Sequence, residues 1–138
     1  MTSINVIENK ISSIRRYLAI LASYQSLSLE QLSSDVTVRG AVERYLYLLA
    51  QAAIELAEAV IAFRNLRKPA TLGEGFSILY DAGILPQRLR DNLTKMAGFR
   101  NILAHDYERL DYGIVYDVLQ NRLGDVEEWA AIVSHLAR

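Results

Sequence analysis

The sequence of 138 residues contains no cysteine, only two prolines and seven glycines, and a formal net charge of −1. Without cysteine, neither a disulfide framework nor a thiolate metal site can form. The near-zero net charge provides no global positive field, so any contact with nucleic acid must come from a local cluster of cations. The sequence also lacks a glycine-rich phosphate loop, a His-x3-His pair and an Asp-x-Asp motif. We therefore predict no metal and no cofactor, and no nucleotidyltransferase activity in this chain.

Targeting and membrane signals are also missing. The N-terminal residues include acidic Glu8 and have no apolar run before a small-residue cleavage site, which is unlike a signal peptide. The longest apolar region is interrupted by Gln51, Glu55 and Glu58, and it falls short of the roughly 18 uncharged apolar residues of a membrane span. We therefore expect a cytoplasmic protein with no membrane partner.

What the sequence does contain is apolar residues at helical spacing. Hydrophobic residues make up 51% and charged residues 22%, which fits one globular domain covering residues 1–138. Between Ile4 and Leu21, large aliphatic residues recur at steps of three and four and predict a first helix with one buried stripe. A polar break from Ser26 to Ser34 follows, with room for a short helical turn at most.

Local signals mark the next helix boundaries. Asp35 is placed to cap a second, long helix that runs to about Leu66. Pro69 cannot continue that helix, and Thr71 with Glu74 three residues later predicts a capping box for a short third helix.

The remaining boundaries follow from two glycines and a proline. Gly83 suits the left-handed turn after the third helix, and Pro86 suits the first turn of a fourth. Asp111 or Tyr112 opens a last helix, which Gly124 could bend. Few runs alternate as strands do, so the sequence predicts an all-α fold, a bundle of four to five helices.

Near the end of the fourth helix, one segment reads Phe-Arg-Asn-Ile-Leu-Ala-His-Asp-Tyr and gathers several reactive groups. Arg100 supplies a planar cation suited to a phosphate, and His105 can act as a general acid or base near neutral pH. Tyr107 adds a phenolic hydroxyl. Asn101 and Asp106 are candidates to orient these neighbours.

Helical geometry restricts how this segment can act. His105 lies five positions after Arg100, about 140° around the axis, whereas Arg100 and Tyr107 fall on nearly the same face. For Arg100 and His105 to meet one phosphate, the helix must loosen or end near Ala104, or a second copy of the chain must supply one group. A simpler alternative is that both residues only cap carbonyls and complement the dipole at a helix end.

The segment resembles the Arg-x4-His-x-Tyr signature of HepT toxins, a branch of the HEPN superfamily. The similarity extends along most of the chain, including Val42-Glu43-Arg44, Gly83-Ile84-Leu85, Met96-Ala97-Gly98-Phe99 and the closing region around Asp125 and Trp129.

This resemblance implies a homodimeric, metal-independent RNase toxin of a type VII toxin–antitoxin system. Arg100 would bind the scissile phosphate and His105 would transfer a proton, with Asn101 and Asp106 in support. Tyr107 would be the residue to which a cognate MntA-type nucleotidyltransferase antitoxin attaches AMP, and the toxin would form a hetero-oligomer with it. The resemblance also leaves open a non-catalytic HEPN module that docks a nucleotidyltransferase, or an antitoxin-like role with the nucleotidyltransferase as the toxin.

Two questions about the long second helix stay open at this point. Gln51 takes a position where many HepT relatives carry an acidic residue, while Glu55 keeps an acid one turn later, and the role of both is unassigned. Tyr45 and Tyr47 could stack on bases, but their helical spacing favours packing in the core or at a dimer interface.

Overall fold

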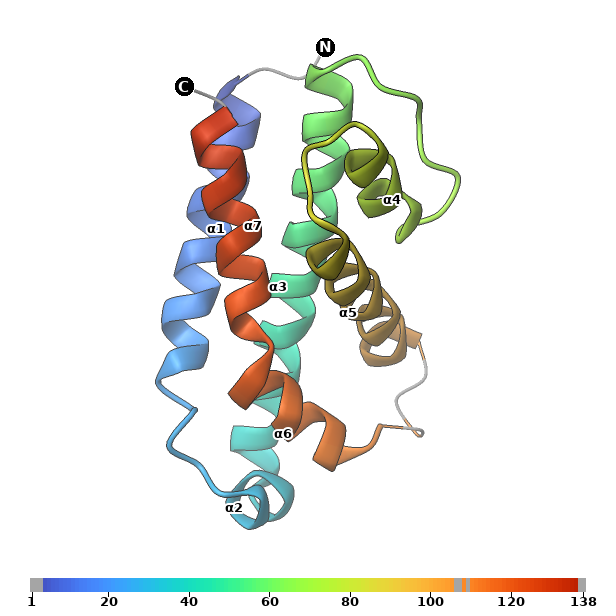
Figure 1. Cartoon of the computed structure of the whole chain (residues 1–138). Coiled ribbons are helices and arrows are strands. Elements are labelled where there is room, and N and C mark those ends of the chain that lie inside the picture. Colours follow the sequence, from blue (N-terminus) through green and yellow to red (C-terminus); the bar gives the residue numbers. More distant parts are fainter. Residues whose placement is uncertain (1–3, 106–107, 109, 137–138) are drawn as a thin grey trace.

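The computed structural model describes residues 4–105, 108 and 110–136, and within these residues the chain forms helices and no strand (Figure 1). The helices in chain order are α1 (Ile4–Ala22), α2 (Leu29–Ser34), α3 (Val36–Phe63), α4 (Glu74–Asp81), α5 (Gln87–His105), α6 (Tyr112–Asn121) and α7 (Leu123–Leu136). The predicted all-α bundle is confirmed, with α1, α3, α5 and α7 as its long members.

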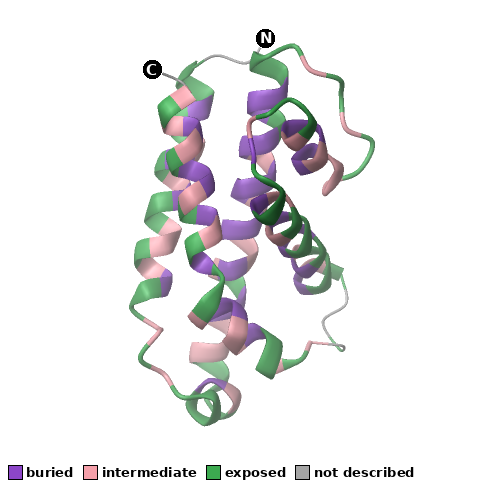
Figure 2. Cartoon of the chain, in the orientation of Figure 1, coloured by how far each residue is buried: buried purple, intermediate pink, exposed green. Residues whose placement is uncertain are grey.

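Helix α3 is the centre of the bundle. It packs against α1, α5 and α7, while α4 lies beside α5 near one end and the short α2 and α6 contact each other at the other end (Figure 1). The buried residues follow the inward faces of the long helices, and the outward faces are exposed (Figure 2). Since α3 and α5 are neighbours, residues near the end of α5 lie against residues from the first half of α3.

The predicted caps are confirmed at some helices and displaced at others. The carboxylate of Asp35 accepts hydrogen bonds from the backbone N–H groups of Thr37 and Val38, both at 3.1 Å, and starts α3. The hydroxyl of Thr71 accepts from the N–H of Glu74 at 3.2 Å, but α4 begins at Glu74 itself, whose carboxylate pairs with Arg67. The predicted capping box at Thr71 is therefore wrong in its second half.

A complete capping box is found instead at α2. Ser28 Oγ accepts from the N–H of Gln31 at 3.1 Å, and Gln31 Oε1 accepts from the N–H of Ser28 at 2.9 Å. This pair satisfies the first donors of a helix of six residues, longer than the single turn expected in the polar break.

The second half of the chain departs from prediction at one point. Gly83 has a φ of +78° directly after α4, and Pro86 directly precedes α5, as expected. The last helix, however, is two helices, because α6 ends at Asn121 and α7 begins at Leu123 near the predicted bend at Gly124. Trp129 fixes α7 on α3: its ring is fully buried and its Nε1 donates to the carbonyl of Ala53 at 3.1 Å.

Helix α3 combines length with apolar character. Among the described residues it is one helix that is long and apolar enough to cross a membrane, with a mean hydropathy of 1.7 over its most apolar window. Of that window 61% is buried inside the bundle, which is the behaviour of a core helix. Its apolar residues therefore pack against the neighbouring helices of the bundle.

Candidate active site

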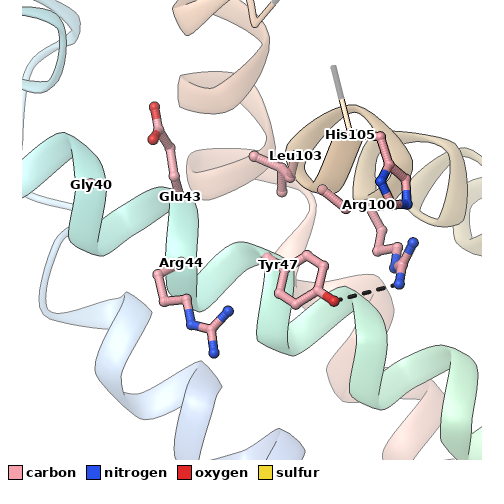
Figure 3. Close-up of a pocket in the computed structure, with 8 residues that line it drawn as sticks. Gly40, Glu43, Arg44, Tyr47, Arg100, Leu103 and His105 are labelled. Carbon is pink, nitrogen blue, oxygen red and sulfur yellow. Dashed lines mark hydrogen bonds between the residues drawn. The ribbon is translucent and has the colours of Figure 1, made fainter. Parts of the chain in front are cut away.

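A cavity of about 370 Å³ lies between the first half of α3 and the end of α5 (Figure 3). Its lining residues are Gly40, Glu43, Arg44, Tyr47, Arg100, Leu103, Ala104 and His105. Helix α5 stays helical from Arg100 through Ala104 to His105, so the expected loosening between the two residues is not seen. Arg100 and His105 of the same chain nevertheless line this cavity.

The side chain of Arg100 is held by three neutral acceptors. Its Nε donates to Gln51 Oε1 at 2.7 Å. One terminal nitrogen donates to Asn101 Oδ1 at 3.0 Å, and the other to the hydroxyl of Tyr47 at 3.4 Å (Figure 3). Within the described part of the chain, no carboxylate forms an ion pair with Arg100. The guanidinium is therefore oriented without being neutralised, which suits a site for an anion.

Behind Arg100, a chain of polar side chains fixes the orientation of Gln51. Gln51 Nε2 donates to Glu55 Oε2 at 3.2 Å, and Lys10 Nζ from α1 donates to Glu55 Oε1 at 2.7 Å. Because the amide nitrogen of Gln51 faces a carboxylate, its oxygen must face Arg100. We call these three residues the Lys10–Glu55–Gln51 chain, and their contacts place Gln51 between Glu55 and Arg100.

The charge of Glu55 is favoured by its neighbours. Partial burial raises the pKa of Glu55, but the hydrogen bonds from Lys10 and Gln51, with the positive charges of Lys10 and Arg100, outweigh it. The net result is a pKa below the ordinary value of 4.5. Glu55 is therefore a carboxylate at neutral pH, and Gln51 stands between this carboxylate and the guanidinium of Arg100. Glu58, in contrast, is exposed.

The other predicted site residues have different positions. His105 is exposed at the rim of the cavity, where an imidazole can exchange protons with a bound molecule and with water. Asn101 is exposed and accepts a hydrogen bond from Arg100, and its supporting role stays a prediction. Asp106 and Tyr107 lie outside the described residues, so their roles stay predictions.

The sequence analysis named Tyr47 and Arg44 but did not place them in one site with Arg100. Tyr45 packs on Tyr17 with ring centroids 6.4 Å apart, as predicted, but Tyr47 lines the cavity beside Arg100. Arg44 lies one turn before Tyr47 on the same face. The spacing of Arg44, Tyr47 and Gln51, a polar stripe on a largely apolar helix, is the signal that could have found them.

Residues 8–133 match the model of a protein family described as Ribonuclease HepT-like. The mRNA nuclease HepT of Shewanella oneidensis is 31% identical over 129 residues, which cover 94% of this chain and 96% of the relative. The chain belongs to the HepT-like family. The resemblance seen in the sequence is confirmed.

One further sequence relative and one solved structure agree with this assignment. The tRNA nuclease HepT of Aphanizomenon flos-aquae is 31% identical over 118 residues, covering 84% of this chain and 80% of the relative. A solved structure of the tri-AMPylated HEPN toxin of Shewanella oneidensis, in complex with MNT antitoxin, superimposes with a TM-score of 0.86 at 31% identity. The superposition covers 98% of this chain and 99% of that toxin.

Proposed function

We propose that this HepT-like protein is the RNase toxin of a type VII toxin–antitoxin system and that it cleaves RNA without a metal, through Arg100 and His105. The observation that carries the proposal is the cavity that both residues line, with an arginine whose described partners are all neutral. The relatives named mRNA nuclease and tRNA nuclease support the choice of RNA as the substrate.

In the proposed reaction the ribose 2′-hydroxyl attacks the adjacent phosphorus. The 2′-oxygen forms a new bond to phosphorus, its proton is removed, and the bond to the 5′-oxygen of the next nucleotide breaks as that oxygen gains a proton. The products are a 2′,3′-cyclic phosphate and a 5′-hydroxyl. Arg100 stabilises the charge that develops on the phosphate oxygens, and His105 takes part in the proton transfer. Asn101 and Asp106 have supporting roles.

A homodimer in the cytoplasm is part of the proposal. His105 lines the cavity and is exposed, so it marks one side of the cavity. A second copy that faces this side would shield the RNA backbone from water and bring a second pair of Arg100 and His105 to the same cleft.

Control by an MntA-type nucleotidyltransferase antitoxin is the second part of the proposal. Tyr107 follows His105 by two positions in the sequence, so AMP joined to its hydroxyl would bring phosphate groups to the site of Arg100. The tri-AMPylated Shewanella toxin in complex with MNT antitoxin supports this role. The intact mass of the toxin co-expressed with its antitoxin should rise by one or more AMP units, and Tyr107→Phe should abolish the rise. If the mass of Tyr107→Phe rises as much as that of wild type, the modification is on another residue.

The nuclease assignment is tested with protein that carries no AMP. His105→Ala should lower the rate of RNA cleavage by about 10²–10⁴-fold, the usual range for loss of a general acid or base. His135→Ala is the matched control, because His135 is the other histidine and is exposed in the last turn of α7, and it should cleave at the wild-type rate. Equal cleavage by wild type and His105→Ala contradicts the catalytic assignment. Wild-type protein that binds the nucleotidyltransferase but cleaves no RNA favours the non-catalytic docking module instead.

A further inference from the structure

A second arginine faces the same cavity from helix α3. The guanidinium carbon of Arg44 lies 5.5 Å from the ring centroid of Tyr47, and that of Arg100 lies 5.3 Å from the same centroid. Figure 3 shows the two arginines on either side of this ring. Tyr47 therefore separates two cations that belong to different helices but share one cavity.

Apart from its contact with the ring of Tyr47, Arg44 has no charged partner within the described structure. Arg44 is exposed, and among residues 4–105, 108 and 110–136 no carboxylate forms an ion pair with it. Arg39 and Arg90 also stack on tyrosines, but Arg39 donates to the carbonyl of Ser33 and Arg90 pairs with Asp91. An exposed stack of arginine on tyrosine contributes little to stability, so stability is a weak reason for Arg44 to face the cavity.

The chemistry of the cavity fits a polyanion with regularly spaced charges. RNA carries one negative charge at each nucleotide, and a guanidinium binds phosphate oxygens through two parallel N–H donors. The ring of Tyr47 between the two cations is half-buried and fixed by the hydrogen bond that its hydroxyl accepts from Arg100. The part of the ring that is exposed between the two guanidinium groups can therefore contact the sugar or base between two phosphates. Gly40, one turn before Arg44, lines the cavity without a side chain.

We propose that Arg44 and Tyr47 form a second nucleotide subsite, in which Arg44 binds the phosphate next to the one held by Arg100 and the intervening nucleotide lies against Tyr47. This inference rests on the proposed function and extends it, because it gives the substrate a minimum length of two phosphates. Arg44 is a binding residue in this scheme, so its loss weakens RNA binding and leaves the chemical step at Arg100 and His105 in place.

Steady-state cleavage of single-stranded RNA at several salt concentrations tests the subsite. Arg44→Ala should raise KM about tenfold with kcat within twofold of wild type, as expected for the loss of one charged hydrogen-bonding partner. The slope of log(kcat/KM) against log salt should become shallower by about 0.7, the value for one phosphate contact to a single strand. Arg44→Lys should keep the salt slope and recover part of the affinity. Arg16→Ala is the matched control, because Arg16 is exposed and lies 5.3 Å from the ring of Tyr17 on α1, outside the cavity.

A binding measurement separates this inference from the nuclease assignment. A fluorescein-labelled 2′-O-methyl RNA ten nucleotides long cannot be cleaved by attack of the 2′-oxygen, so its Kd is measured independently of catalysis. Arg44→Ala should raise this Kd about tenfold, and Arg16→Ala should not change it. Equal Kd values and salt slopes for wild type and Arg44→Ala overturn the subsite even if the wild type cleaves RNA. Normal RNA binding with reduced AMP transfer by the antitoxin also overturns it, since Arg44 would then serve the protein partner.

Discussion

The two ends of helix α5 carry the same residue type in opposite electrostatic settings. Near its start, Arg88 donates to both carboxylate oxygens of Glu128 at 2.9 and 2.7 Å, and lies 3.6 Å from Asp125. The hydrogen bond and charge of Glu128, assisted by Asp125, raise the pKa of Arg88 above its ordinary value. Near its end, Arg100 is held by Gln51, Asn101 and Tyr47, which carry no charge.

This difference separates a structural arginine from one that is ready for a ligand. A phosphate that approached Arg88 would have to compete with two carboxylates of α7. At Arg100 it meets a guanidinium whose direction is already fixed, because Gln51 is itself fixed by Glu55 and Lys10. Neutral acceptors thus provide orientation while the positive charge remains available.

The largest expected effect comes from removing each arginine in turn. Arg100→Ala should lower kcat/KM for RNA by about 10²–10³-fold, the usual result of removing a donor that stabilises transition-state charge. Arg88→Ala should leave kcat/KM within twofold of wild type, because Arg88 contacts only α7 carboxylates among its described partners. The measurement is steady-state RNA cleavage by protein free of AMP. Comparable losses of kcat/KM in both variants would contradict the proposed difference between Arg100 and Arg88.

A smaller effect is expected when a carboxylate is placed beside Arg100, like the carboxylates that contact Arg88. Gln51→Glu keeps the length of the side chain but places a carboxylate against the guanidinium, so phosphate binding must compete with an ion pair. Many HepT relatives carry an acid at this position, but in this chain Glu55 already supplies a carboxylate one turn later, so the substitution adds a second one. We expect kcat/KM to fall about tenfold, which corresponds to about 1.4 kcal/mol. Gln87→Glu, which adds the same charge at the exposed start of α5, is the control and should have wild-type kinetics. Full activity in Gln51→Glu would show that the neutrality of the acceptor is unimportant.

The smallest expected effect is on how the free energy of unfolding depends on pH, through Glu55 of the Lys10–Glu55–Gln51 chain. The pKa of Glu55 is lowered in the folded protein, so its contribution is fully present above the ordinary value of 4.5. It is lost as the pH falls through the lower folded value. Because this side chain is 37% exposed, the contribution at neutral pH should be at most about 1 kcal/mol. Urea unfolding of wild type and Glu55→Gln should differ by this amount at pH 7, and the difference should shrink on acidification. A difference that grows at low pH contradicts the direction of the shift.

Much of the fold was predictable because the signals are local. The aliphatic spacing of α1, the cap at Asp35 and the left-handed turn at Gly83 depend on neighbours within a few residues. The break between α6 and α7 was placed only as a bend, since a single glycine inside a helical pattern does not decide between bending and breaking. The capping box at Ser28 has the Ser-x-x-Gln pattern typical of such boxes. It was not predicted, because it lies in a polar stretch.

The site was predictable only where its residues are close in sequence. Arg100 and His105 belong to one segment of α5, so their types and spacing could be read together from the sequence. Gln51 lies 49 positions before Arg100, and the contact between them depends on how α3 packs against α5. Arg44 and Tyr47 depend on the same packing, which no spacing within one segment specifies.

The most direct test of the account is the identity of the ends that wild-type protein leaves on RNA in the presence of EDTA. The account predicts undiminished cleavage with 2′,3′-cyclic phosphate and 5′-hydroxyl ends, because a guanidinium and an imidazole perform the reaction on the 2′-hydroxyl. Cleavage that stops when EDTA is added, or that leaves 3′-hydroxyl and 5′-phosphate ends, would contradict it, since those ends require a water molecule as the nucleophile.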